Sequence, residues 1–221
     1  MLSRQPHRSL LSYRQTKGDF SRRERSMSST RRNILSTLLA TPALAMIGSN
    51  RIAAQPALGL DLTPDCHDAD DHTIAQTEGP YFKPNAPLKH NLAVDAPRGE
   101  KMTIGGFVLD TACRPLSKTI VQVWHADETG AYDTAGYRLR GYQFTDRDGR
   151  WWFSTIVPAA YAGRTRHYHL KVQKPGGRIL TTQLYFPDEP LNSRDSLFDR
   201  RLVLRLGDSD DGRLGRFDFV V

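Results

Sequence analysis

The chain contains eight short segments rich in β-branched and aromatic residues, separated by stretches with glycine, proline, aspartate or asparagine. This pattern is typical of short β-strands joined by turns. No segment before the strands repeats apolar residues with a helical period, so crossover helices are not expected. The sequence therefore predicts an all-β fold, a two-sheet β-sandwich of about eight strands of the prealbumin or immunoglobulin kind, with little helix. The predicted strands span residues 102–109, 119–126, 142–145, 151–157, 167–172, 180–185, 202–206 and 217–221.

Two segments outside the predicted strands have sequences that predict a turn or a short helix. Residues 146–149 read Asp-Arg-Asp-Gly, a turn sequence that predicts a β-hairpin between the flanking strands. Residues 195–201 can form one helical turn.

The formal net charge of +7 comes from the first 32 residues, which contain nine Lys or Arg and two acidic residues. The rest of the chain is formally neutral. A neutral folded domain exerts no overall attraction on a polyanion, so nucleic-acid binding is not expected.

In the N-terminal segment, basic, apolar and small residues follow one another in the order that is typical of a signal peptide. Arg31 and Arg32 directly precede an apolar run at 34–47, which is too short to span a bilayer, and small residues follow at 53–54. The arginine pair makes the segment similar to a twin-arginine signal, which directs export of folded proteins. We therefore expect a periplasmic or extracellular protein with no stable membrane span. The alternative is a disordered basic tail before a short buried helix, and Met27 is an alternative start.

The expected organisation is a basic leader with the signal peptide at 1–54, a polar linker at 55–75 and the β-sandwich domain at 76–221. The two cysteines, Cys66 and Cys113, can form one disulfide in an oxidising compartment. The alternative is two unrelated thiols. Two cysteines at this spacing are not a zinc motif.

His167 and His169 lie in one predicted strand. Side chains two residues apart in a strand point to the same face, so both imidazoles can reach one metal ion. Taken alone, such a pair is more often an ordinary strand face making hydrogen bonds. No cysteine or carboxylate cluster lies nearby in the sequence to complete a zinc or calcium site.

Several ordered blocks change this interpretation, because together they resemble the signature of the intradiol ring-cleavage dioxygenases. The later blocks include Thr-Asp-Arg-Asp-Gly at 145–149, Thr-Ile-Val-Pro at 155–158 and His-Tyr-His at 167–169. The resemblance covers roughly residues 76–206. The other blocks lie at 77–81, 104–108, 115–116, 121–125, 130–132, 138–141, 182–187 and 190–191.

The resemblance implies a non-haem Fe(III) site with four protein ligands, Tyr132, Tyr161, His167 and His169. Phenolate oxygens suit a hard ferric ion, and metal binding must then deprotonate both tyrosines. It also implies three neighbouring roles. Arg164 would stabilise negative charge on the substrate, Gln183 would orient ligand or substrate, and Tyr81 would help wall the substrate pocket.

The sequence departs from the family pattern at positions that are not ligands. Gln122 stands where an acid is usual, Cys113 where a small Gly or Ser is usual, and Thr165-Arg166 where Pro-Ala is frequent. Arg166 adds a charge near the expected pocket, which bears on substrate preference.

The implied reaction uses dioxygen to open a catechol-type ring between its two hydroxylated carbons, giving a muconate-type diacid. Its partners are a small aromatic diol and O2, and Tyr161 is the ligand expected to leave when the diol chelates iron. Catechol-cleaving relatives commonly carry a helical N-terminal dimerisation region for which this chain has no room, which favours a protocatechuate-type or exported branch. A homo-oligomer is compatible with the sequence. The rival hypothesis is an exported, non-catalytic β-sandwich that binds a carbohydrate or protein partner.

Overall fold

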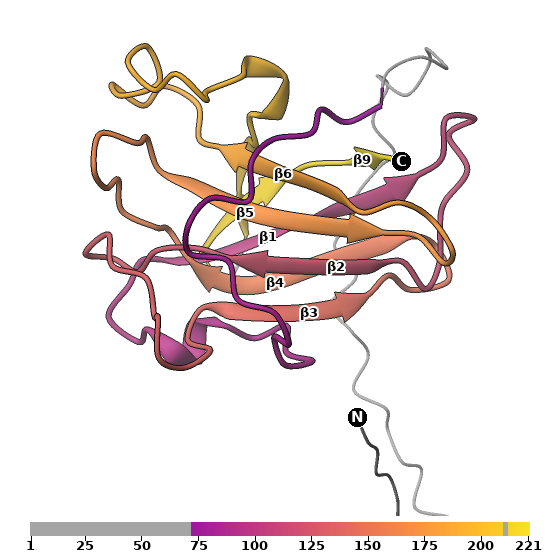
Figure 1. Cartoon of the computed structure of the whole chain (residues 1–221), viewed down its shortest axis with the longest axis horizontal. Helices are drawn as coiled ribbons and strands as arrows, with labels where there is room; N and C mark the ends of the chain where they lie inside the picture. Colours follow the sequence, from indigo (N-terminus) through magenta and orange to yellow (C-terminus); the bar gives the residue numbers. More distant parts are fainter. Residues whose placement is uncertain (1–71, 210–211) are drawn as a thin grey trace, which may run out of the picture. The chain divides into compact units, whose positions relative to one another are not determined.

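The computed structural model describes residues 72–209 and 212–221. The strands are β1 Lys101–Leu109, β2 Ile120–Trp124, β3 Arg140–Phe144, β4 Arg150–Ile156, β5 His167–Gln173, β6 Leu180–Tyr185, β7 Arg205–Ser209, β8 Gly212–Arg216 and β9 Phe219–Val220. Two short 3-10 helices, η1 Ala93–Asp95 and η2 Arg200–Leu202, lie between them. One sheet has the order β4-β1-β8-β7 with β9 paired to β1. The other has the order β3-β2-β5-β6 (Figure 1). The predicted two-sheet β-sandwich is confirmed.

The hydrophobic core lies between the two sheets. In β5, Tyr168, Leu170 and Val172 belong to the buried apolar cluster, whereas the alternate residues His167 and His169 do not. Side chains alternate between the two faces of a strand, so the two histidines lie on the outer face of the four-stranded sheet. That face is where the candidate site forms.

The first six predicted strands are confirmed, and none of their bounds differs by more than two residues. The end of the chain differs from the prediction. Residues 202–206 hold the end of η2 and the start of β7, the predicted last strand shrinks to β9, and β8 was missed. β8 reads Gly-Arg-Leu-Gly-Arg, a sequence with low intrinsic strand preference that pairs with β1 and β7 on both sides. The predicted helical turn at 195–201 takes the form of η2, slightly later in the chain.

The predicted hairpin at 146–149 is wrong, although the turn itself forms with Gly149 N donating to Asp146 O at 3.1 Å. The strands on either side, β3 and β4, belong to different sheets. Thr145 N donates to Thr119 O at 2.8 Å beside β2, while Val108 N in β1 donates to Gly149 O at 2.8 Å. The turn therefore carries the chain from one sheet to the other.

The segment before β1 crosses the outer face of the four-stranded sheet (Figure 1). We call residues 73–83 the N-terminal strap. Gln76 N donates to Thr181 O in β6 at 2.7 Å, and the strap continues toward β3, where Lys89 N donates to Tyr142 O at 3.1 Å. The strap therefore covers the face that carries His167 and His169.

The predicted leader at 1–54 and residues 55–71 of the predicted linker lie outside the described residues. Cys113 is disulfide-bonded, whereas Cys66, the partner that the sequence offers, also lies outside them. No helix in the described part is long and apolar enough to cross a membrane.

Replacing Tyr168 with phenylalanine tests how the two sheets are joined. The Tyr168 hydroxyl is buried and donates to Ile156 O at 2.9 Å in the opposite sheet. Tyr168→Phe leaves that carbonyl without its partner and should lower the free energy of unfolding by about 1–3 kcal/mol. Urea denaturation measures this loss. Tyr142→Phe, on the outer face of β3, is the matched control and should cost less than half as much; equal losses would contradict the assignment.

Candidate metal centre

One row of side chains runs across the outer face of the four-stranded sheet. Trp124 pairs with Arg140 in β3 on one side and with His169 in β5 on the other. His169 pairs in turn with Gln183 in β6. Residues directly opposite in paired strands point to the same face, so this register sets Arg140, Trp124, His169 and Gln183 side by side.

The two histidines point their Nε2 atoms at each other, with 3.1 Å between them. His167 Nδ1 lies 2.6 Å from Thr165 O, which fixes the proton on Nδ1 and leaves the Nε2 lone pair free. The His169 ring stacks on Trp124 with centroids 5.0 Å apart. Burial lowers the pKa of His167 to about 4 and that of His169 well below its ordinary value. Both imidazoles are therefore neutral at pH 7, the state that binds a metal.

Tyr132 comes from the loop after β2. The Asp127 carboxylate organises this loop by accepting a hydrogen bond from Ala131 N at 3.0 Å. A Cβ at Gly130 would lie 2.9 Å from Ala160 O, so only glycine allows this loop to approach the next one so closely. Burial raises the pKa of the Tyr132 phenol, and the neighbouring Tyr161 hydroxyl raises it further.

Tyr161 comes from the loop after β4. Arg164 N donates to Tyr161 O at 2.7 Å and Tyr161 N donates to Arg164 O at 3.3 Å, which closes a tight turn over Ala162 and Gly163. The same turn therefore fixes the backbone of Tyr161 and Arg164 next to β5.

The four predicted ligands form a closed circuit of ring contacts. Ring centroids are 5.2 Å apart for Tyr132 and Tyr161, and 5.6 Å apart for Tyr161 and His167. They are 4.7 Å apart for His167 and His169, and 6.2 Å apart for His169 and Tyr132. The fold thus brings together residues that come from two loops and one strand.

The donor set fits a hard cation that accepts both phenolate oxygen and imidazole nitrogen. Within the described part of the chain, the buried Tyr132 hydroxyl and His169 Nδ1 have no hydrogen-bond partner. The same part holds no group of three or more His, Cys, Asp or Glu that could bind a metal.

The N-terminal strap covers this circuit. Tyr81 stacks on Tyr132 with centroids 4.4 Å apart and planes at 12°, and its ring meets the edge of Tyr161. Gly79 has a φ of +70°, and a Cβ there would lie 3.2 Å from His169 Cε1. Tyr81 therefore lies against both tyrosines of the circuit.

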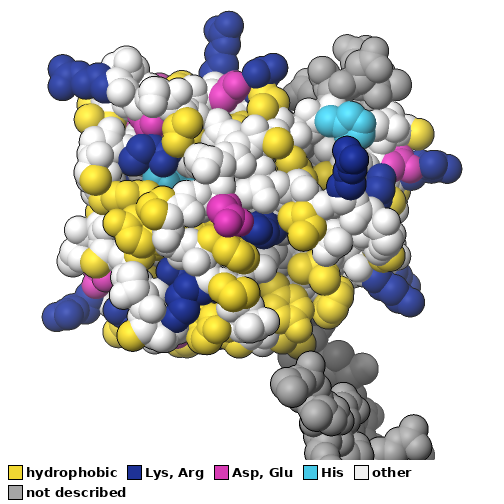
Figure 2. All heavy atoms as spheres, in the orientation of Figure 1, with side chains coloured by type: hydrophobic (Ala, Val, Ile, Leu, Met, Phe, Trp, Pro, Cys, Tyr) yellow, Lys and Arg dark blue, Asp and Glu magenta, His cyan; other side chains and the backbone are white. Residues whose placement is uncertain are grey.

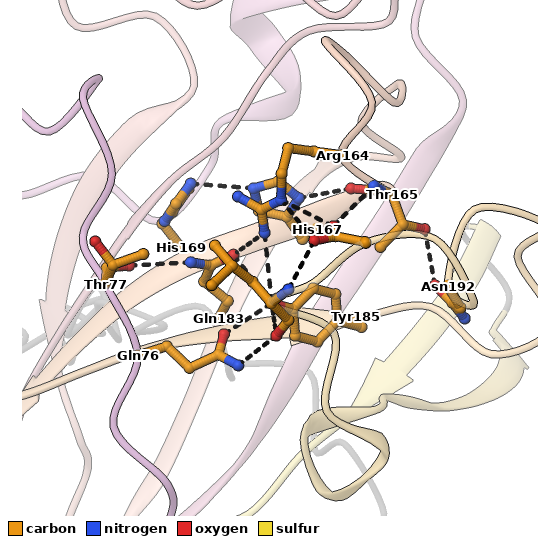
Figure 3. Close-up of polar contacts among 11 residues, drawn as sticks. Gln76, Thr77, Arg164, Thr165, His167, His169, Gln183, Tyr185 and Asn192 are labelled. Carbon is orange, nitrogen blue, oxygen red and sulfur yellow. Dashed lines mark hydrogen bonds and ion pairs between the residues drawn. The ribbon is translucent and has the colours of Figure 1, made fainter.

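Arg164 and Gln183 meet at the edge of the circuit (Figure 3). Arg164 Nη2 donates to Gln183 Oε1 at 2.6 Å, and Gln183 Nε2 donates to Thr77 O of the strap at 3.0 Å. Arg164 Nε donates to Asp195 Oδ2 at 2.8 Å, and Thr165 N donates to the same oxygen at 3.0 Å. Burial raises the pKa of Asp195, but these hydrogen bonds outweigh it and hold the carboxyl below its usual pKa.

Sequence reasoning missed two residues of this site, Asp195 and Arg140. The Asp195 carboxylate is buried and lies 31 positions from Arg164 in the chain, so no local pattern marks the pair. Arg140 is also buried, at one end of the row on the sheet. The only signal for it was its place in the Arg-Leu-Arg-Gly block at 138–141.

Arg166, which departs from the family pattern, has its charge paired. Its Nε lies 3.1 Å from Glu189 Oε2. On the outer surface, Lys and Arg side chains are scattered around the outline with Asp and Glu among them (Figure 2).

The model of the protein family Dioxygenase matches residues 77–221. The chain belongs to the intradiol ring-cleavage dioxygenase family. Members of this family generally depend on non-haem iron.

Relatives with known names support this assignment. The chain is 34% identical over 135 residues to the protocatechuate 3,4-dioxygenase beta chain of Burkholderia cepacia, covering 51% of this chain and 57% of that protein. It is 29% identical over 185 residues to chlorocatechol 1,2-dioxygenase of Rhodococcus opacus, covering 67% of this chain and 72% of that protein. The match to the first relative thus covers less than two thirds of its length.

Among solved structures, the fold is similar to the dioxygenase domain of a dioxygenase carbohydrate-binding protein fusion from Streptomyces sp. SirexAA-E. The two are 48% identical, with a TM-score of 0.66, over 68% of this chain and 98% of that one.

The buried histidines make stability depend on pH. Burial lowers the pKa of both His125 and His167 to about 4, below the 6.5 of an unfolded histidine, so the unfolded chain binds more protons between these values. In the metal-free protein, the free energy of unfolding should therefore fall as pH drops from 6.5 to 4, by about 1.4 kcal/mol per pH unit for each histidine. Denaturation in urea at several pH values measures the slope.

His125 lies outside the circuit, so His125→Gln isolates its share of the slope. This variant should show a clearly smaller pH dependence, whereas His90→Gln, which removes an exposed imidazole, should keep the parent slope. An unchanged slope in His125→Gln would contradict the buried, neutral state of this histidine.

Proposed function

We propose that this protein is a non-haem Fe(III)-dependent intradiol dioxygenase. It cleaves a catechol-type ring between the two hydroxylated carbons with O2 and releases a muconate-type diacid. The observation that carries the proposal is the closed circuit of Tyr132, Tyr161, His167 and His169. The relatives named above act, by their names, on protocatechuate and chlorocatechol, which are both aromatic diols.

Bound Fe(III) supplies Lewis acidity that holds a deprotonated diol and makes it reactive toward dioxygen. His167 and His169 offer neutral Nε2 atoms, and the Thr165 carbonyl and the Trp124 ring keep both imidazoles in place. Tyr132 would keep its position at the ion, because its ring packs against Tyr81 on one side and Tyr161 on another.

Tyr161 would help hold the ion, and its phenolate oxygen could accept a proton from the diol. It lies on a tight turn and its side chain is only half-buried, so it can move without disturbing β5.

Arg164 and Gln183 orient the reacting ring. Asp195 fixes the Arg164 guanidinium through Nε, so its charge stays at the edge of the site and stabilises negative charge that develops on the ring. Gln183 is locked between Arg164 and the strap, and Tyr81 excludes water from above Tyr132.

The proposed substrates are catechols of the protocatechuate type or other diols met outside the cytoplasm. The rival hypothesis of a non-catalytic binding module is not favoured by the family match. A homo-oligomer is not needed to complete the site, since all four rings come from one chain.

Oxygen uptake by iron-loaded protein tests this function, with catechol, protocatechuate and hydroxyquinol as substrates. We expect uptake of one O2 per diol, a muconate-type product, and visible colour from tyrosinate bound to iron. Tyr132→Phe should remove most of the colour and lower the rate at least about a hundredfold, whereas Tyr142→Phe should keep both. A colourless wild-type protein that stays inactive after iron loading would refute the proposal.

We also propose that the protein is exported through the twin-arginine pathway, which the sequence of the leader supports. Replacing Arg31 and Arg32 with lysine should leave the protein in the cytoplasmic fraction of a bacterial host, with its leader uncleaved. Replacing Arg22 and Arg23 in the same way is the matched control and should leave export unchanged. Fractionation followed by mass measurement of the N-terminus decides, and export of the Arg31/Arg32 variant would contradict the proposal.

A further inference from the structure

Arg140 is a buried cation at the end of the row that contains His169. Its residue surface is only 2% exposed, and it pairs with Trp124, whose ring stacks on His169. Arginine is seldom buried unless an acid neutralises it. No carboxylate in the described part of the chain forms an ion pair with Arg140, and its Nη1 is buried without a partner there.

The two other guanidinium nitrogens of Arg140 bind the loop that carries Tyr132. Nε and Nη2 donate to Asp133 O at 3.2 and 3.0 Å. The Asp133 side chain accepts from Gly136 N at 2.7 Å and Arg138 N at 2.8 Å, which closes the loop on itself. A two-nitrogen contact to the residue after Tyr132 therefore fixes where the phenol of Tyr132 can lie.

Among the described residues, no carboxylate forms an ion pair with the Arg140 guanidinium, although the Asp133 charge acts on it. Arg164, the other guanidinium nearby, forms an ion pair with Asp195. A buried, uncompensated charge is costly, and an anion forming next to it recovers that cost. Tyr132 is the neighbouring group that would become an anion on binding a metal, and the contact with Asp133 O holds the Arg140 guanidinium against its loop.

We propose that Arg140 is a positioning residue for Tyr132. It holds the Tyr132 loop through Asp133 O and supplies the counter-charge of the Tyr132 phenolate. This inference rests on the proposed iron site. It gives Arg140 a task at the Tyr132 loop, whereas the contacts of Arg164 are with Asp195 and Gln183.

Three variants of the full chain separate charge from packing. Arg140→Gln removes the charge, and Arg140→Lys keeps the charge but loses the two-nitrogen contact. Arg216→Gln is the matched control, because Arg216 is a partly buried arginine in β8 of the opposite sheet. Fe(III) retention is measured by competition with a chelator, and the position of the tyrosinate-to-iron band is measured by visible absorption.

Arg140→Gln should hold Fe(III) at least about tenfold more weakly, about 1.4 kcal/mol, because it loses both the positive charge and the two-nitrogen contact that holds the Tyr132 loop. Its band should move to longer wavelength, because a phenolate without a neighbouring cation is a better electron donor. Arg140→Lys should keep the wild-type band and lose less iron affinity, and Arg216→Gln should match wild type in both. The shift in Arg140→Gln should vanish when Tyr132→Phe is also present.

A wild-type band and wild-type iron retention in Arg140→Gln would overturn the proposal. If this variant does not fold, Arg140→Lys decides, and iron retention equal to wild type would overturn the positioning role. Failure of the proposed function is distinct, because the wild-type protein itself would then show neither bound iron nor the band.

Discussion

The alternation of side chains along β5 is the constraint on which the rest of the structure depends. Tyr168 points between the sheets, where its hydroxyl donates to Ile156 O of the opposite sheet. His167 and His169 must then point outward together. A slip of one residue would bury both imidazoles in the apolar core and expose Tyr168, so core packing and the candidate site fix the same register.

The same register also determines which side chains lie next to the histidines on the outer face of the four-stranded sheet. Pairing of β5 with β2 and β6 places His169 between Trp124 and Gln183. The Trp124 ring stacks on His169, and β6 supplies the amide of Gln183 on the other side. The sheet offers ligands to a metal from one side only. The two tyrosines lie on two loops, and the close approach of these loops requires Gly130. The N-terminal strap then closes the site from above, with Tyr81 on Tyr132.

The features that could be predicted from the sequence are those that depend on a local pattern of residues, such as strands and turns. Strand segments with β-branched and aromatic residues were found, whereas β8 was missed because two glycines and two arginines weaken its local signal. The turn at 146–149 was correct as a turn and wrong as a hairpin, since pairing partners are set by distant strands. The predicted site residues do gather in space, but Asp195 and Arg140 could not be predicted, because their roles arise from contacts between distant segments.

Anomalous diffraction at the iron edge from crystals of iron-loaded protein tests the central claim most directly. We predict one strong peak among four atoms, His167 Nε2, His169 Nε2, Tyr132 Oη and Tyr161 Oη. A peak elsewhere in the molecule, or no peak in a protein that still cleaves catechols, would contradict the account.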